Sequence, residues 1–248
     1  MAGHSHWAGI KHKKALIDSK RGKLWSSLSK AIIIAAKMGG GDVDSNPRLR
    51  QAIADAKAVS MPKDNIERAV KRGTGELDGG NVEEILYEGY GPHGVAVLCD
   101  ALTDKRTRTG PELTKLFEVH NGKLGKSNSV AYMFERKGVF LIAQENNDEE
   151  QIMETAMEAG AEDIQLVGDN FEVTCPPEAY TDVAEALTNA EVECVSRSID
   201  RIPTTTVDLG PQEAEAVLKL IDALDDHDDV QNVSANFNIP EETLKAMG

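Results

Sequence analysis

A dense group of cationic side chains lies within the first 76 residues. Its members are Lys11, Lys13, Lys14, Lys20, Arg21, Lys23, Arg48, Arg50, Lys63, Arg68, Lys71 and Arg72. This segment has 15 Lys and Arg against seven Asp and Glu, and Asp18 is the only acid among its first 40 residues. Lys and Arg bind phosphate oxygens, whereas an ordinary solvated surface mixes both signs of charge. The pattern therefore predicts contact with the phosphates of a nucleic acid rather than a merely solvated helix face.

An aromatic residue and three histidines accompany the first lysines. Trp7 either stacks on an unpaired base or anchors the N-terminal arm on the first helix, and both interpretations are open. His4, His6 and His12 are candidate metal ligands, but the spacing supplies no fourth ligand and a mobile arm seldom holds a closed site. We therefore predict no metal site.

A second cluster of basic and hydroxyl residues, 103–109, follows a predicted strand. Arg106 and Arg108 lie among several threonines just before a predicted helix, where backbone N–H groups and guanidinium groups could hold a phosphate. The alternative is a capped, solvated loop in which Asp104 pairs with one of the arginines. The lysines that follow favour the binding interpretation.

Motifs of enzymes and metal proteins are missing or incomplete. The segment 42–53 begins like a calcium loop, but Pro47 and Ile53 stand where that loop needs Gly and Glu. The segment 73–78 lacks the third Gly of a dinucleotide fingerprint and follows a helix. No phosphate-loop, nucleophile-elbow or zinc-protease motif occurs. We predict no catalytic residues and no cofactor; an enzyme with a cleft between domains is a third, weaker alternative.

Composition limits the remaining classes. The 248 residues have a formal charge of −15, and residues 77–248 carry 12 Lys and Arg against 35 Asp and Glu. Only 4% of residues are aromatic, which argues against a broad base-stacking sheet. The longest apolar run is far shorter than the roughly 20 residues of a membrane span. Three widely spaced cysteines, Cys99, Cys175 and Cys194, are typical of buried thiols in a reducing cytoplasm.

Apolar periodicity and turn residues predict three helices followed by α+β segments. Helices are expected over 19–38, from Pro47 with Asn46 as its N-cap, and from Pro62. Leu24, Leu28, Ala31, Ala35 and Met38 would form the apolar face of the first helix. Strands are expected at 85–90, 95–102 and 129–134, and a helix at 110–120.

The later segments predict a second α+β unit and a tail. Residues 138–201 follow the order βαββαβ of a ferredoxin-like sandwich, with Asp169-Asn170 as its central turn. A strand at 204–209, a helix at 211–224 and a strand at 230–237 would pair with the earlier strands. We expect an α+β fold with a basic arm and helical domain (1–76), a discontinuous domain (77–134 plus 203–248) and an inserted ferredoxin-like domain (135–202).

Five long motifs resemble those of the YebC/PmpR family, which includes the mitochondrial translational activator of cytochrome c oxidase. They are MAGHSHWAGIKHKKALIDSKRGK, GGGDVDSNPRLRQAI, MPKDNIERAVKRGTGE, YEGYGPHGVAVLCDALTD and NGKLGKSNSVAYMF. The resemblance spans essentially the whole chain. It implies a three-domain cytoplasmic α+β protein, described as a probable DNA-binding transcriptional regulator, with other members tied to the ribosome and to stalling at proline runs. By motif, the cations of the head, Lys14 apart, resemble the family's residues that face nucleic acid.

These observations predict a non-enzymatic, nucleic-acid-binding regulator of gene expression. Our first hypothesis is a DNA-binding transcriptional regulator. The alternative is a ribosome-associated factor that grips rRNA or tRNA through the same head. We expect a cytoplasmic monomer without membrane contact or small-molecule substrate.

Overall fold

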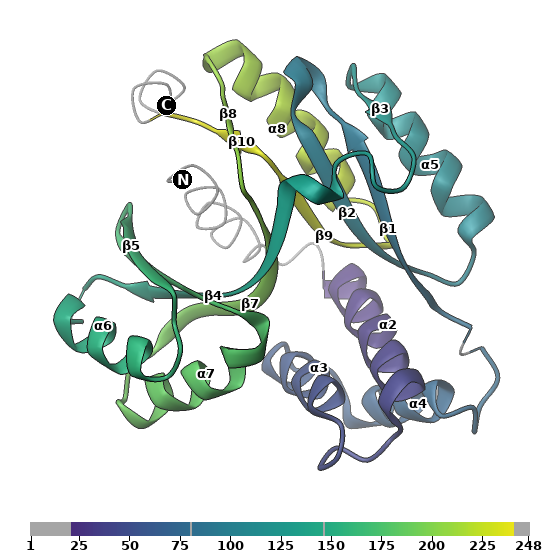
Figure 1. The fold of residues 1–248 in the computed structure, drawn as a ribbon. Coiled ribbons are helices and arrows are strands. Elements are labelled where there is room, and N and C mark those ends of the chain that lie inside the picture. The colour runs from purple at the N-terminus through teal and green to yellow at the C-terminus, as the bar shows by residue number, and fades with distance from the viewer. Residues whose placement is uncertain (1–20, 80, 146, 241–248) are drawn as a thin grey trace. The chain divides into compact units, whose positions relative to one another are not determined.

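A computed structural model of the chain describes residues 21–79, 81–145 and 147–240 (Figure 1). These residues divide into two compact units. The first unit holds 21–130 and 212–233, and the second holds 131–211 and 234–240. The expected α+β class, with helices first and sheets after them, is confirmed. The three domain boundaries stay a prediction.

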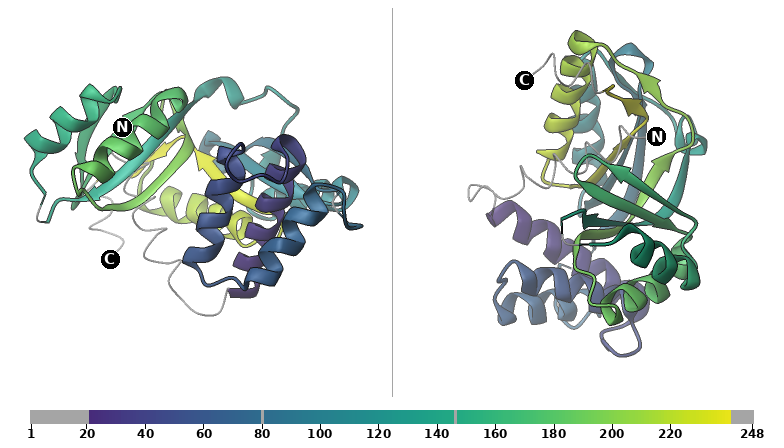
Figure 2. Two further views of the ribbon diagram at one scale, coloured as in Figure 1. Left: turned by 90° about the horizontal axis from the view of Figure 1, so that it is seen from below. Right: turned by 90° about the vertical axis from the view of Figure 1, so that its left-hand side faces the viewer.

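Three helices begin the first unit: α2 (Arg21–Gly39), α3 (Pro47–Ala58) and α4 (Lys63–Gly73). Asn46 caps α3 as predicted, because its side-chain oxygen accepts a hydrogen bond from Leu49 N at 3.0 Å. The same side chain donates to Ala35 O and Gly40 O, each at 2.9 Å, and so ties the end of α2 to the start of α3. Helix α2 packs against both α3 and α4 (Figure 2).

The buried face of α2 differs from the predicted one. The consecutive run 32–36 is buried, whereas Leu24 and Met38 are 41% and 69% exposed. A single apolar stripe is expected of a helix that covers a core from one side. Here α3, α4 and Leu102 of the adjoining sheet all pack against α2, so a continuous run is buried.

The sheet of the first unit has four strands in the order β3-β1-β2-β9. Their bounds are β1 (Glu83–Tyr90), β2 (Ala96–Thr103), β3 (Lys123–Leu124) and β9 (Val230–Ala235). Strand β1 pairs antiparallel with β2 and β3. Helices α5 (Arg106–Val119) and α8 (Pro211–Asp225) bury Leu113, Phe117, Leu220 and Ile221 in this unit. A strand from the end of the chain therefore completes a sheet begun near residue 83.

The second unit contains the predicted βαββαβ order. Its elements are β4 (Phe134–Ala143), α6 (Glu149–Glu158), β5 (Asp163–Val167), β6 (Asn170–Cys175), α7 (Tyr180–Asn189) and β7 (Cys194–Pro203). The strand order is β5-β6-β4-β7 and every neighbouring pair is antiparallel. Helices α6 and α7 lie side by side (Figure 1). They bury Ile152 and Leu187 in one core with Phe140 and Phe171. The short strands β8 (Val207–Asp208) and β10 (Phe237–Asn238) pair in parallel as a separate two-stranded sheet. The prediction that the strand at 204–209 pairs with the earlier strands was therefore wrong; only β9 does so.

The predicted central turn of the second unit and the predicted strand at 129–134 were wrong in detail. The central turn of the second unit is Gly168-Asp169, one residue early, because Val167 pairs with Asn170 and Gly168 supplies a φ of 59°. Residues 129–133 form no strand; they contain a 3-10 turn, η3 (Ala131–Met133), and β4 begins after it. Two further 3-10 turns are η2 (Pro92–Gly94) and η4 (Pro177–Ala179).

Helix α5 begins at Arg106, four residues before its expected start at Gly110. The sequence suggested a later start because Pro111 lacks an N–H and disfavours a helix interior. The first turn is nevertheless held by Arg108 N and Thr109 N, which donate to Lys105 O at 2.9 and 3.2 Å. Arg106 and Arg108 therefore project from a helix rather than from a loop before it.

Candidate nucleic-acid interface

The predicted binding residues differ in how much of them the structure describes. Trp7, Lys11, Lys13, Lys14 and Lys20 lie outside the described residues, as do His4, His6 and His12. Arg21 and Lys23 lie at the start of α2, where only the backbone is described. The others share an exposed position: Arg48, Arg50, Lys63, Arg68, Lys71, Arg72, Arg106 and Arg108.

The two arginines of α3 are held by acceptors of the same unit. Arg48 Nη2 lies 2.9 Å from Glu84 Oε2, in an ion pair whose side chains are both about half exposed. Arg50 donates to Val43 O and Asp44 O at 3.2 and 2.8 Å. Both guanidinium groups keep other N–H donors, since each carries five. They are thus positioned cations at the surface.

The cations of helix α4 have fewer hydrogen-bond and ion-pair partners toward the C-terminal end of the helix. Lys63 Nζ lies 3.5 Å from Glu67 Oε1, and Arg68 donates to Asp64 O at 3.3 Å and also to Asn65. For Lys71 and Arg72 the described residues supply no ion-pair partner. A cation in the last turn is favoured by the helix dipole without any carboxylate. These two side chains are therefore open to an external anion.

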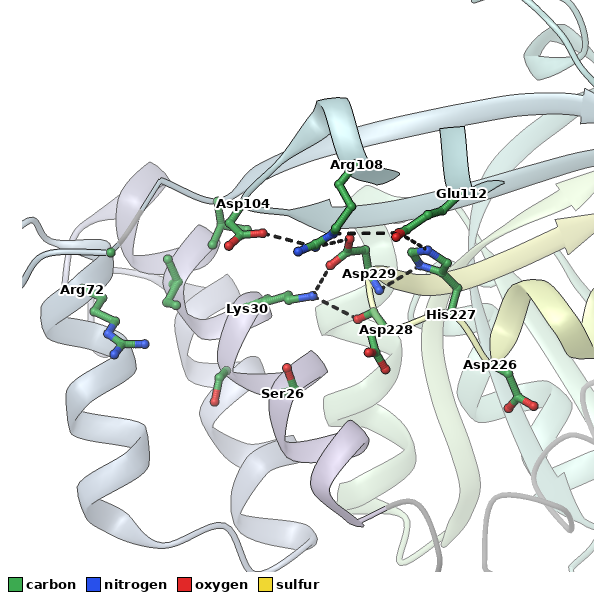
Figure 3. A pocket seen from close by; sticks show the side chains of 14 residues that line it. Ser26, Lys30, Arg72, Asp104, Arg108, Glu112, Asp226, His227, Asp228 and Asp229 are labelled. Carbon is green, nitrogen blue, oxygen red and sulfur yellow. Dashed lines mark hydrogen bonds and ion pairs between the residues drawn. The ribbon is translucent and has the colours of Figure 1, made fainter. Parts of the chain in front are cut away.

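Arg108 has a different environment, because it binds a buried carboxylate. Arg108 Nη2 lies 2.6 Å from Asp229 Oδ2, and Thr109 Oγ1 donates to the same oxygen at 2.6 Å. On the other side of the carboxylate, Lys30 Nζ lies 2.5 Å from Asp229 Oδ1. Figure 3 shows Lys30, Arg108 and Asp229 converging from α2, α5 and the turn before β9. We call Lys30, Arg108, Thr109 and Asp229 the Asp229 cluster.

The Asp229 cluster favours the ionised form of the Asp229 carboxylate. Burial alone would raise the pKa of Asp229, whose side chain is 1% exposed, but hydrogen bonds from Lys30, Thr109 and Arg108 outweigh it. The pKa of Asp229 consequently lies well below its usual range. The hydrogen bond to Asp229 also raises the pKa of Arg108. Arg108 is thus first a structural cation, and the Asp104–Arg108 contact of the alternative interpretation is present at 3.3 Å.

Sequence reasoning missed Lys30 and Asp229. An acidic run such as 222–229 is typical of a solvated helix end, but its last member, Asp229, is buried. Lys23, Lys30 and Lys37 recur every seven residues and so share one face of α2. Lys30 binds Asp229, and the exposed Lys37 donates to Val82 O at 3.2 Å, so these two lysines contact other elements of the first unit. The seven-residue repeat of lysines was the signal in the sequence that could have identified Lys30. Its partner, Asp229, could not be recognised, because it lies 199 residues away.

An open pocket of about 700 Å³ adjoins the cluster, and Arg72 and Ser26 are among the residues that line it (Figure 3). Glu112, His227 and Asp229 offer ligand atoms within 4.8 Å of one another, a possible metal arrangement. Their atoms already have partners, however. Asp229 N donates to His227 Nδ1, and His227 Nε2 lies against Glu112 Oε2, both at 3.1 Å. Since both oxygens of Asp229 also accept from cations, the arrangement favours a structural junction over a metal site.

Arg106 lies near the same helix start without such partners. It is exposed, and among the described residues no carboxylate pairs with it. Its charge lowers the pKa of Tyr87, although burial, the larger influence, raises that pKa above its ordinary value. Arg106, unlike Arg108, is therefore open to an external anion. The described helices include none that is long and apolar enough to cross a bilayer.

Comparisons with known proteins show which family the chain resembles. The family described as TACO1/YebC protein N-terminal domain matches residues 5–76, and that described as TACO1/YebC second and third domain matches 82–237. A probable transcriptional regulatory protein of Rhodopirellula baltica is 57% identical over 245 residues, which is 98% of this chain and 99% of that protein. One from Natranaerobius thermophilus is 52% identical over 248 residues, 99% of each chain.

A solved structure agrees with the sequence matches. The crystal structure of a conserved hypothetical protein from Aquifex aeolicus has a TM-score of 0.87 and 47% identity, and it covers 96% of this chain and 99% of that one. Sequence motifs, fold and relatives point the same way, and the chain belongs to the TACO1/YebC family.

Proposed function

We propose that this protein regulates gene expression by binding nucleic acid through its basic helical head, without catalysis. The observation that carries the proposal is the surface of α3 and α4, which exposes seven cations; the described residues supply no anion to two of them, Lys71 and Arg72. The names of its relatives, probable transcriptional regulatory proteins, support the regulatory role.

The contacts of α3 and α4 favour phosphate binding over base reading. Amide side chains such as Gln and Asn read base edges when their donors and acceptors are free. Here Gln51 Nε2 donates to Asp55 Oδ1 at 2.7 Å, and Asn65 accepts from Arg68. The head thus offers positioning contacts to the backbone of a nucleic acid, which carry no sequence information directly. Recognition of a particular DNA site then needs the residues before α2 or the shape of the duplex.

Duplex DNA is our first candidate partner, in agreement with the names of the relatives. The second candidate is structured RNA of the ribosome, which is also recognised largely through its backbone and shape. Gln51 and Asn65 each have one amide group engaged by a neighbour on the same helix, which weakens base reading by that amide and favours this second candidate. Neither function requires chemistry at the pocket. Its buried carboxylate, Asp229, stays ionised and saturated by Lys30, Arg108 and Thr109, as a structural group does and a general base does not.

Titration of the full chain against duplex DNA and against ribosomal RNA over a range of salt tests the proposal. Each phosphate contact to a duplex contributes about −0.9 to the slope of log K against log salt. The double variant Lys71→Gln/Arg72→Gln should flatten the slope by about 2 units. Lys219→Gln on α8, which also removes an exposed cation, is the matched control and should leave it unchanged. A salt-independent affinity, or equal slopes for all three proteins, would contradict the proposal.

A further inference from the structure

A second surface of the first unit combines a partly exposed aromatic ring with two exposed lysines. Tyr90, at the end of β1, is 39% exposed and lies directly opposite Lys123 of β3 in the sheet register. Side chains of directly opposed residues lie on the same face as neighbours. Lys126 and Asn128 follow in the exposed loop 125–129. We call Tyr90, Lys123 and Lys126 the Tyr90 surface.

A buried carboxylate holds the loop that carries these lysines. Glu88 is 5% exposed, and its two oxygens accept from Asn128 N at 2.6 Å and Val130 N at 2.9 Å. Its backbone oxygen accepts from Gly125 N at 2.7 Å. A buried charge is costly unless it is satisfied by such hydrogen bonds, so it strongly favours this one loop conformation. These bonds also explain why residues 129–133 form no strand.

Close packing further restricts the loop. A Cβ on Gly122 would lie 2.7 Å from Tyr90 O, and one on Gly125 would overlap the hydroxyl of Ser129. Asn128 adopts a φ of 65°, a left-handed conformation that is uncommon outside glycine. Strained residues on well-determined loops cluster at binding sites.

The aromatic ring is positioned by the same loop. Tyr90 Oη donates to Ser129 O at 3.3 Å, which fixes the phenol while its ring stays partly exposed. The two ammonium groups have no carboxylate partner among the described residues. Between Leu113 and Val130 there are three lysines and a single acid, Glu118. The surface is locally cationic although residues 77–248 as a whole are strongly acidic.

We infer that the Tyr90 surface binds an unpaired stretch of nucleic acid, with one base stacked on Tyr90 and the flanking phosphates on Lys123 and Lys126. An aromatic platform flanked by cations is the usual means of gripping a single strand, because every base has a π-face and every linkage a charge. The inference rests on the proposed function and adds to it a second contact, away from α3 and α4 in sequence. According to this inference, the nucleic acid that the protein binds includes single-stranded segments.

Binding of short unstructured oligonucleotides, one RNA and one DNA, to full-length variants tests the inference. Tyr90→Leu should weaken binding about 5- to 150-fold, the range for loss of one stacked base, whereas Tyr90→Phe keeps the ring and most of the affinity. Tyr132→Leu removes another exposed tyrosine, 73% exposed, and should have no effect. Lys123→Gln/Lys126→Gln should flatten the salt slope by about 1.4 units, since a single strand contributes about 0.7 per phosphate.

The outcomes separate this inference from the proposed function. If Tyr90→Leu and the double lysine variant bind like the unchanged protein while Lys71→Gln/Arg72→Gln binds weakly, the Tyr90 surface is refuted and the basic head stands. If the unchanged protein binds none of the oligonucleotides, duplexes or ribosomal RNA, both are refuted. Should Tyr90→Leu unfold, the double lysine variant decides alone, because Lys123 and Lys126 are exposed. Preference for the RNA or the DNA strand identifies the physiological class.

Discussion

Lys30 and Asp229 form an ion pair of 2.5 Å although 199 positions separate them in the sequence. Lys30 belongs to the basic helices and Asp229 to the turn before the last strand of the first sheet. Leu102 N donates to Asp229 O at 2.8 Å, so the same residue also joins β2. The pair thus attaches the helical head to the sheet of the first unit through a buried, fully hydrogen-bonded charge.

Replacing Asp229 by Asn should destabilise the fold strongly. The change leaves Lys30 and Arg108 facing a neutral amide, and removal of one partner of a buried ion pair costs about 3–5 kcal/mol. Urea denaturation monitored by circular dichroism measures the loss. Asp228→Asn, at the exposed neighbouring position, serves as the control and should change stability by less than about 0.5 kcal/mol.

Stability should also depend on pH through Asp229. Because its pKa is lowered on folding, its ionised form contributes stability that is present above the unfolded pKa of about 4 and is lost as pH falls toward the lower folded value. The free energy of unfolding should therefore fall as pH is lowered below about 4. The fall should be shallower in Asp229→Asn, and parallel curves for the two proteins would contradict this assignment.

The two arginines of α5 should separate binding from stability. Arg106 is exposed without an ion-pair partner among the described residues, so Arg106→Gln should reduce affinity for nucleic acid and leave thermal stability unchanged. Arg108→Gln should lower stability by about 1.5–3 kcal/mol, because it removes one hydrogen bond from the buried charge of Asp229 while Lys30 and Thr109 remain. Melting temperatures and binding titrations on the same preparations make the comparison, and a stable Arg108→Gln with weak binding would reverse the assignment.

Asn46 should be important for the helical head. Its side chain caps α3 and donates to two carbonyls at the end of α2, so Asn46→Ala should cost about 2 kcal/mol or more. Asn46→Asp keeps the acceptor for Leu49 N but loses the donors, and an intermediate loss is expected. Equal stability of the alanine and aspartate variants would show that only the two donated hydrogen bonds matter and that the cap does not.

The local features of this fold could be predicted from sequence, whereas its long-range contacts could not. Asn46 before Pro47 specifies a helix start through chemistry confined to four residues, and the βαββαβ order follows from local alternation. The early start of α5 could not be predicted, because Pro111 is a local signal that the hydrogen bonds of the first turn override. Similarly, the burial of Asp229 depends on Lys30 and Arg108, and neither lies near it in the chain.

The candidate site shows the same division. The cations of α3 and α4 lie at the surface, as their charge leads one to expect, whereas their role in binding stays a prediction. Composition could not separate Arg106 from Arg108, two residues apart, since one faces outward and the other binds Asp229. The role of Glu88 was equally hidden, because its partners, the N–H groups of Asn128 and Val130, belong to the backbone and carry no sequence signal.

The late position of β9 has a consequence for synthesis of the protein. The ribosome adds roughly 5–20 residues per second, so several seconds pass between the emergence of β2 and that of Asp229. During this interval the nascent chain already displays its cations, while the anchor that orients them does not yet exist. A correctly oriented basic head is thus a property of the finished polypeptide, and a prematurely terminated product would carry the charge without the geometry.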